Sequence, residues 1–159
     1  MAAAILIRRF RPGDEPALAA VIHTSVHQLA KQDYTTEQLE AWAPTVYDED
    51  RWAERIRALR PFVAEIEGMA AGYADLQASG LIDHFFVAGT HAGRGVGNAL
   101  METIHGEAKR LGLGALFADV SLTAEGFFAK HGFLIETHQT VMTRGVALAN
   151  ARMRKRLGP

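Results

Sequence analysis

Three glycines alternate with other residues in a short stretch near the middle of the chain. The stretch reads Ala92-Gly93-Arg94-Gly95-Val96-Gly97-Asn98. Glycines let backbone N–H groups converge because no Cβ obstructs them, and a helix that begins here would add the positive end of its dipole. Arg94 would add a side-chain cation. The combination predicts a site for a phosphate or pyrophosphate group, and the alternative is a turn in which glycines only permit close packing.

The same residues exclude two common nucleotide-binding motifs. A Walker loop needs Lys followed by Ser or Thr after its last glycine, and Asn98 follows here. A dinucleotide fingerprint needs a third small residue, which the spacing from Gly93 or Gly95 would place at Asn98 or Leu100. The loop must therefore hold a different phosphate-bearing ligand, if it holds one.

Apolar periodicity predicts the elements that would position this loop. Strand-length runs cover 5–10, 62–66, 71–77, 81–87, 115–120, 133–142 and 147–157. Helical spacing begins after Asp14 and after Thr35, and covers 49–59, 98–111 and 123–130. We expect an α/β (α+β) fold whose mixed, mostly antiparallel sheet has about six to seven strands and is flanked by about four to five helices. The length of 159 residues suits one domain over the whole chain, 1–159.

Local signals mark two helix starts. Asp14 is the predicted N-cap of the first helix, and Thr35 with Gln38 forms a predicted capping box for the second. In the first helix, one apolar stripe is expected to be buried, made of Leu18, Val21, Ile22 and Leu29.

Composition limits the partners and the chemistry. Lys and Arg number 17 against 18 Asp and Glu, so no global field attracts nucleic acid or an anionic membrane. The chain has no cysteine, which excludes disulfides, thiolate metal ligands and a cysteine nucleophile. The start lacks a basic leader, and no apolar run approaches about 20 residues. We therefore expect a soluble, cytoplasmic protein.

Two segments resemble the GNAT family of N-acetyltransferases. The glycine stretch is similar to the family's acetyl-CoA signature, Q/R-x-x-G-x-G/A, and its distance from Val87 is the family's usual one. A second family element, A-x-x-F-Y-x-x-x-G-F, is matched by 124–133, which reads AEGFFAKHGF. The segments 34–42 and 121–128 also resemble the YafP-like subgroup of small bacterial acetyltransferases.

This resemblance implies a GNAT fold and acetyl transfer from acetyl-CoA to a primary amine of a small molecule or peptide by direct attack. The thioester would lie beside Val87, whose N–H would bond its carbonyl. The implied coenzyme-binding residues are Phe86, Val87, Ala92, Gly93, Arg94, Gly95, Val96, Gly97, Asn98, Phe127 and Phe128. Dimers are common among such proteins, so a homodimer is one expected assembly.

Three residues depart from the family pattern. Ala92 stands where Gln or Arg is usual, and Gly89 where Pro is usual; neither change removes a backbone N–H. Phe128 replaces a Tyr whose hydroxyl protonates the leaving thiolate in many relatives. Water, Ser121 or the departing amine's own proton must replace that hydroxyl. An alternative function is a GNAT-like module that binds acyl-CoA without catalysis.

Acyl transfer needs a group that removes a proton from the attacking amine. Asp83, in an apolar strand-like run, is the first candidate; the alternative is a structural salt bridge to Arg144 or Arg152. His84 is the second candidate, although a lone strand histidine is more often packed than catalytic. Ser121 is a third candidate that could bond the thiolate or, like Thr123, only cap the following helix.

Aromatic residues near the early helices and in the strand-like run 71–77 are candidates for binding the acceptor. They are Tyr34, Trp42 and, more weakly, Tyr73, and the alternative is that they are core residues. His23 and His27 lie one helical turn apart, a spacing that suits two metal ligands. Because no third ligand follows from the sequence, we expect both to be exposed and no metal to be bound.

Overall fold

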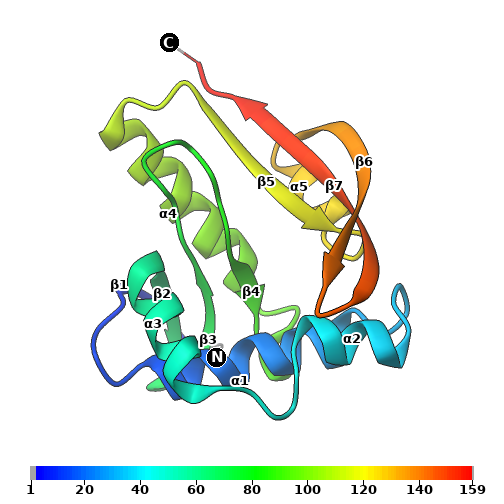
Figure 1. Cartoon of the computed structure of the whole chain (residues 1–159). Helices are drawn as coiled ribbons and strands as arrows, with labels where there is room; N and C mark the ends of the chain where they lie inside the picture. Colours follow the sequence, from blue (N-terminus) through cyan, green and yellow to red (C-terminus); the bar gives the residue numbers. More distant parts are fainter. Residues whose placement is uncertain (1–2, 159) are drawn as a thin grey trace.

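The computed structural model describes residues 3–158, and these form two antiparallel sheets covered by helices (Figure 1). The strands are β1 (Ile5–Arg9), β2 (Phe62–Ile66), β3 (Met69–Ala74), β4 (Phe85–Val87), β5 (Ala115–Ser121), β6 (Leu134–Thr143) and β7 (Val146–Arg156). The helices are α1 (Glu15–Thr24), α2 (Thr36–Trp42), α3 (Glu49–Leu59), α4 (Val96–Leu111) and α5 (Glu125–Lys130), with a π-helical turn η1 (Ser25–Leu29) and a 3-10 turn η2 (Gly89–His91). The predicted α+β fold class is confirmed.

The two sheets meet at one end and separate at the other. One sheet has the order β1-β2-β3-β4 and the other β5-β7-β6. A single parallel bridge joins Leu81 to Phe117, and the amide of Ile82 donates to the Phe117 carbonyl at 2.9 Å. Beyond this point β4 and β5 diverge, as Figure 1 shows. The facing edges of β4 and β5 therefore do not pair with each other.

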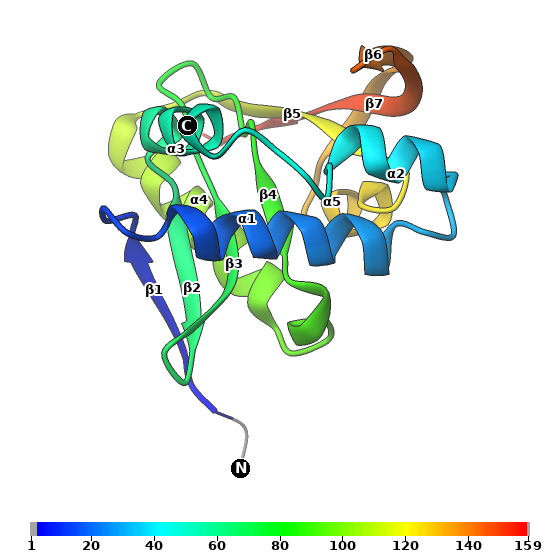
Figure 2. The same ribbon diagram turned by 60° about the horizontal axis from the view of Figure 1, so that its bottom comes forward.

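The first sheet is buried on both faces. Phe62, Ala64 and Ile66 of β2 pack in the core cluster that contains α4, whereas Val63 packs with residues of α1 and α3. Figure 2 shows α1 crossing one face of this sheet while α4 lies behind it. Four of the five residues of β2 are apolar and buried, as a strand covered on both faces requires, and the exception is Glu65.

The π-helical turn changes which side of the first helix is buried. Val26 is 1% exposed, whereas Leu29, which was predicted to be buried, is 36% exposed. A π-helical turn is wider than an α-helical turn, so it rotates the residues that follow out of the α-helical register. The predicted stripe therefore holds for Leu18 and Val21 but is wrong for Leu29.

The helix starts follow the predicted caps in part. The capping box is confirmed. The backbone N–H of Gln38 donates to Thr35 Oγ1, and the backbone N–H of Thr35 donates to the Gln38 side-chain Oε1. Asp14 is the N-cap residue of α1, but its carboxylate accepts from Arg8 and does not cap the helix. Helix α4 begins at Val96, two residues before its predicted start, after Gly95 with a φ of 84°. A φ of this sign lies in the left-handed region, which favours glycine, so the backbone explains why residue 95 is a glycine.

The predicted strand 81–87 is shorter than expected. Only Phe85–Val87 pairs as a strand, because the Asp75 carboxylate accepts hydrogen bonds from the amides of Asp83 and His84 at 2.9 and 2.6 Å. At His84 the Asp75 carboxylate replaces the backbone carbonyl as acceptor, while the Asp75 amide still donates to the His84 carbonyl at 3.1 Å. Within residues 3–158, no helix combines the length and the apolar character needed to cross a membrane.

Candidate active site

A cavity of about 200 Å³ lies where β4 and β5 diverge. Its walls include Val87 of β4, Gly97 in the first turn of α4, and Phe127 of α5. A Cβ built on Gly97 would lie 3.1 Å from the Phe127 ring, so a larger side chain would enter this space. Of the predicted coenzyme-binding residues, the cavity gathers Phe86, Val87, Gly97, Phe127 and Phe128.

The other predicted coenzyme-binding residues form the loop before α4 and its first turn. Ala92, Gly93, Arg94 and Gly95 are exposed, whereas the Val96 side chain is 1% exposed and packs in the core. Asn98 accepts a hydrogen bond from His131 Nε2 at 3.0 Å if that nitrogen carries the proton. The first amides of α4 have no partner within their helix. The loop therefore presents backbone N–H groups that are free of helical partners beside the exposed Arg94.

The Val87 amide faces the opening between the sheets. In the β3–β4 ladder, the Ala88 amide donates to the Ala71 carbonyl at 2.8 Å, and the Asp75 amide donates to the His84 carbonyl at 3.1 Å. Because N–H groups alternate in direction along a strand, the Val87 amide points away from β3. It is directed toward the side where β5 has diverged.

A second, larger cavity of about 1040 Å³ adjoins the first. It is bounded by α1, the segment between α2 and α3, β4 and the β6–β7 hairpin, and it is lined by Tyr34, Trp42, Asp83 and His84 among others. Three residues, Trp42, Phe86 and Ser121, line both cavities. The two spaces therefore meet at these three side chains.

Asp83 forms an ion pair with an arginine that the sequence analysis did not consider. Arg55 Nη2 of α3 donates to Asp83 Oδ2 at 2.8 Å. The expected partners are therefore wrong: Arg152 pairs with Asp119, and Arg144 donates to the Ala41 carbonyl. Arg51 and Arg55 are four residues apart in α3 and both line the large cavity. No local spacing rule connects Arg55 of α3 to Asp83, so sequence reasoning had no signal for this pair.

Tyr73 is buried behind the cavity wall and contacts His84, which is partly buried and lines the cavity. The Tyr73 hydroxyl lies 2.9 Å from His84 Nδ1 and has no other hydrogen-bond partner among the described residues. Burial lowers the pKa of His84 from 6.5 to about 4, with Asp83 opposing the shift and Arg55 adding to it. Tyr73 is 0% exposed, and burial raises the pKa of its hydroxyl. The predicted contact of Tyr73 with a substrate is corrected: it reaches the cavity only through His84.

Ser121 and Thr123 have different roles at the start of α5. Ser121 Oγ accepts from the Ala124 amide at 3.2 Å, and Thr123 Oγ1 donates to Asp33 Oδ2 at 2.7 Å. The expected cap at Thr123 is therefore wrong. Ser121 stabilises the turn before α5 through this hydrogen bond, and it also lines both cavities. It therefore remains a candidate site residue.

Tyr34 is both a cavity residue and a structural link. Its hydroxyl donates to the Ala149 carbonyl at 2.6 Å and accepts from the Leu122 amide at 3.0 Å. Burial raises the pKa of this hydroxyl. Its ring packs edge-on against Trp42. Both hydrogen-bonding positions are occupied, so Tyr34 offers its ring to the cavity.

His23 and His27 are half-buried, which contradicts the expectation of exposed side chains. Their rings stack with centroids 4.1 Å apart. Glu40 of α2 lies beside them, a residue that no spacing rule connects to the pair.

Comparison with known proteins identifies the fold. A family profile described as "Acetyltransferase (GNAT) domain" matches residues 30–157. The chain belongs to the GNAT acetyltransferase family. The resemblance in the glycine loop and in 124–133 is thereby confirmed, and the chain is assigned as an N-acetyltransferase.

Individual relatives support this GNAT assignment. The chain is 34% identical over 151 residues to the uncharacterized N-acetyltransferase YafP of Escherichia coli K12, covering 94% of this chain and 95% of YafP. A GCN5-related N-acetyltransferase from Rhodopseudomonas palustris is also 34% identical, with a TM-score of 0.93 over 99% of this chain and 98% of that one. The YncA acetyltransferase of Salmonella typhimurium, solved with acetyl-CoA, is 20% identical with a TM-score of 0.70, over 99% and 96% of the two chains.

Proposed function

We propose that this GNAT protein transfers an acetyl group from acetyl-CoA to a primary amine of a small molecule or peptide by direct attack. The observation that carries the proposal is the junction of the two cavities at Trp42, Phe86 and Ser121. The narrow cavity suits the pantetheine arm and the wide one suits an acceptor. Their junction is the place where thioester and amine would meet.

The narrow cavity and the glycine loop fit the coenzyme. Gly97 leaves room beside Phe127, and the exposed loop before α4 offers N–H groups and Arg94 to a pyrophosphate. When bound, acetyl-CoA supplies an activated acetyl group. The Val87 amide, directed toward the opening, would donate to the thioester carbonyl and stabilise the negative charge that develops on its oxygen.

Asp83 is the proposed base. Among the described residues, the Tyr73 hydroxyl has one hydrogen-bond partner, His84 Nδ1. If the hydroxyl donates to this nitrogen, neutral His84 carries its proton on Nε2. His84 then offers the cavity an N–H and not a lone pair. The Asp83 carboxylate lines the same cavity and keeps free oxygen positions beside Arg55, so it would accept the amine's proton directly or through water.

The wall of the large cavity also offers groups that suit an amine. Asn150 Oδ1 is buried and has no hydrogen-bond partner among the described residues, and Asn150 lines this cavity. An ammonium or amine N–H would satisfy that oxygen. The Trp42 ring adds an aromatic face against which a cationic or flat acceptor would stack.

Phe128 favours the alternative of a module that binds acyl-CoA without catalysis. Its ring is 3% exposed and packs 5.0 Å from the Phe133 ring, and it cannot protonate a thiolate. We propose that Ser121, which lines both cavities, or water supplies that proton. The two functions differ in one observable, the release of free coenzyme A thiol.

The test is thiol release from acetyl-CoA with a panel of primary amines of different size and charge. Because the chain has no cysteine, every thiol detected in excess of hydrolysis comes from transfer. Acceptor-dependent release, with the acetylated amine found by mass spectrometry, supports the enzyme. Binding of acetyl-CoA without release for any amine in the panel supports the non-catalytic module.

A further inference from the structure

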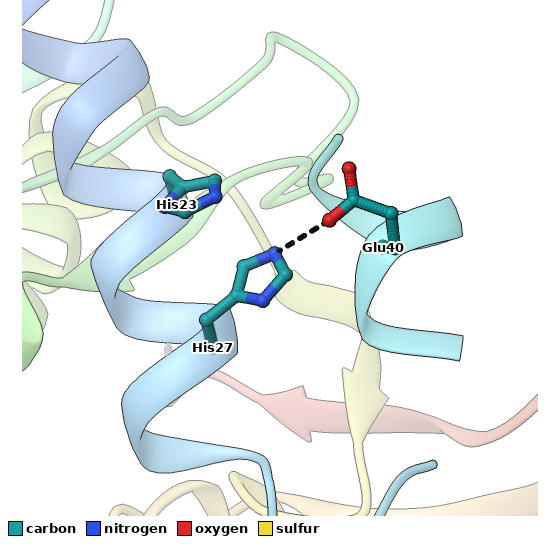
Figure 3. Close-up of side chains that lie close together, drawn as sticks. All are labelled: His23, His27 and Glu40. Atoms are coloured by element: carbon teal, nitrogen blue, oxygen red, sulfur yellow. Dashed lines mark ion pairs between the residues drawn. The ribbon is translucent and has the colours of Figure 1, made fainter. Parts of the chain in front are cut away.

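Two histidines and a glutamate converge beside the large cavity. His23 is in the last turn of α1 and His27 in η1, and their rings stack with an interplanar angle of 25°. Figure 3 shows both rings and the Glu40 carboxylate, which comes from α2, directed toward one another. One ligand atom from each residue lies within 4.8 Å of the other two, and His27 Nε2 is 3.7 Å from Glu40 Oε2.

The Glu40 carboxylate is held in place by Thr45. The Thr45 amide donates to Glu40 Oε1 at 2.6 Å, and Thr45 Oγ1 donates to Oε2 at 3.0 Å. The two hydrogen bonds hold the Glu40 carboxylate in one orientation. Outer groups that orient a carboxylate in this way are typical of metal sites.

One ring nitrogen of each histidine has a hydrogen-bond partner that a cation would replace. In the present arrangement His23 Nε2 is 3.1 Å from Thr45 Oγ1, and His27 Nε2 is 2.7 Å from the Ala43 carbonyl. A cation would replace these two single hydrogen bonds, with the imidazole proton on Nδ1.

We propose that His23, His27 and Glu40 form a binding site for a divalent transition-metal cation of the Zn²⁺ type. Two imidazoles and one carboxylate favour Zn²⁺, Co²⁺ or Ni²⁺ over Mg²⁺ and Ca²⁺, which prefer oxygen ligands. Three protein ligands leave at least one coordination position for water or another ligand. His23 and Thr45 line the large cavity, so this position lies at the cavity's edge.

The site would join two segments that are distant in the sequence. His23 and His27 belong to the long first helical segment, and Glu40 belongs to α2, which also carries Trp42. A cation bound to all three would fix α2 against this segment and thereby stabilise one wall of the large cavity. Its binding does not require acetyl-CoA, so the site is tested independently of the proposed transferase activity.

The test is metal binding by the full chain without an affinity tag, after treatment with a chelator. Isothermal titration with Zn²⁺ and visible absorption with Co²⁺ report the affinity and the ligand geometry. We expect one cation per chain, and a loss of affinity of about tenfold or more in His23→Gln and Glu40→Gln. Mg²⁺ should not compete. Glu40 is exposed, so Glu40→Gln is the variant least apt to disturb folding.

The matched control is His138→Gln, because His138 Nδ1 lies 3.8 Å from Glu125 Oε1 and so forms another histidine–glutamate pair. This variant should bind Zn²⁺ as the unmodified protein does, and circular dichroism should be the same for all variants. The proposal is overturned if the unmodified chain binds no Zn²⁺ at 100 µM cation, roughly the limit for a weak site. Equal binding by Glu40→Gln and the unmodified chain would overturn it as well.

Discussion

The Tyr73 hydroxyl lies 2.9 Å from His84 Nδ1, and this contact connects the buried face of β3 to the wall of the large cavity. Tyr73 is completely buried, and its hydroxyl has no other partner among residues 3–158. The contact therefore orients the His84 ring and, where the hydroxyl is the donor, places the proton of neutral His84 on Nε2. Through this contact, the core residue Tyr73 influences whether His84 Nε2 presents an N–H or a lone pair to the large cavity.

Replacing Tyr73 with Phe should reduce stability without changing the packing volume greatly. The change leaves His84 Nδ1 without its partner, and an unpaired buried polar group costs about 1–3 kcal/mol. The free energy of unfolding from urea titration measures this cost. Tyr47→Phe is the control, because Tyr47 is 39% exposed, and its effect should stay within about 0.5 kcal/mol. Equal effects of the two changes would contradict the assigned contact.

Stability should fall as the pH is lowered from about 6.5 to about 4. Burial lowers the pKa of His84 from 6.5 to about 4 in the folded protein. Over this interval the unfolded chain binds a proton that the folded chain does not. Lowering the pH therefore stabilises the unfolded state relative to the folded state. The total loss is at most about 3–4 kcal/mol, and the slope disappears about one pH unit above 6.5, where His84 is neutral in both states.

The neighbouring charges of Asp83 and Arg55 also shift the pKa of His84. The prediction is therefore a difference in pH dependence between the unmodified protein and a His84 variant. Urea titrations at several pH values should give a smaller slope between pH 4 and 6.5 in His84→Gln than in the unmodified protein. A His84 pKa near 6.5, measured by NMR in the folded protein, would contradict the prediction.

Asp83→Asn should reduce kcat/KM for the acceptor by about 10²–10⁴-fold, the usual contribution of a general base. Binding of acetyl-CoA should stay the same because Asp83 does not line the narrow cavity. Arg55→Gln is the matched control: it removes the ion-pair partner and keeps the carboxylate. Its activity should stay well above that of Asp83→Asn. If Asp83→Asn retains full activity, the base is another group.

Gly97→Val should abolish coenzyme binding while the protein remains folded. A Cβ at Gly97 would already lie 3.1 Å from the Phe127 ring, and the two further methyl groups would occupy the narrow cavity. Titration calorimetry with coenzyme A measures the loss. Gly106→Ala in the same helix has open space around its Cβ and should bind normally, with stability raised by up to about 1 kcal/mol. Normal binding by Gly97→Val would place the coenzyme elsewhere.

Most of the fold follows from local sequence signals. Helix α3 has the predicted bounds 49–59, and the strand and helix order is as expected, because apolar periodicity and caps are short-range properties. The exceptions depend on contacts between distant residues. The strand ending at Val87 is short because the amides of Asp83 and His84 donate to the Asp75 carboxylate and not to a backbone carbonyl.

The site was predicted less completely than the fold. The glycine loop is visible in the sequence because its chemistry depends on consecutive residues. Arg55 pairs with Asp83 across 28 positions, and Glu40 approaches His27 from another helix. Neither pairing has a periodicity that a sequence displays. The sequence analysis expected Tyr73 to contact the substrate. Its burial behind His84 depends on how α1 and α3 cover the sheet, which the sequence does not display.

The most direct test of the proposed function is thermal unfolding of the protein with acetyl-CoA, coenzyme A, ATP and NAD in parallel. A ligand that binds only the folded state raises the melting temperature, by an amount that grows with its concentration relative to Kd. We expect acetyl-CoA and coenzyme A to raise it and ATP and NAD to leave it unchanged. No rise with either coenzyme, at concentrations well above ordinary coenzyme affinities, would contradict the assignment of the narrow cavity and the glycine loop.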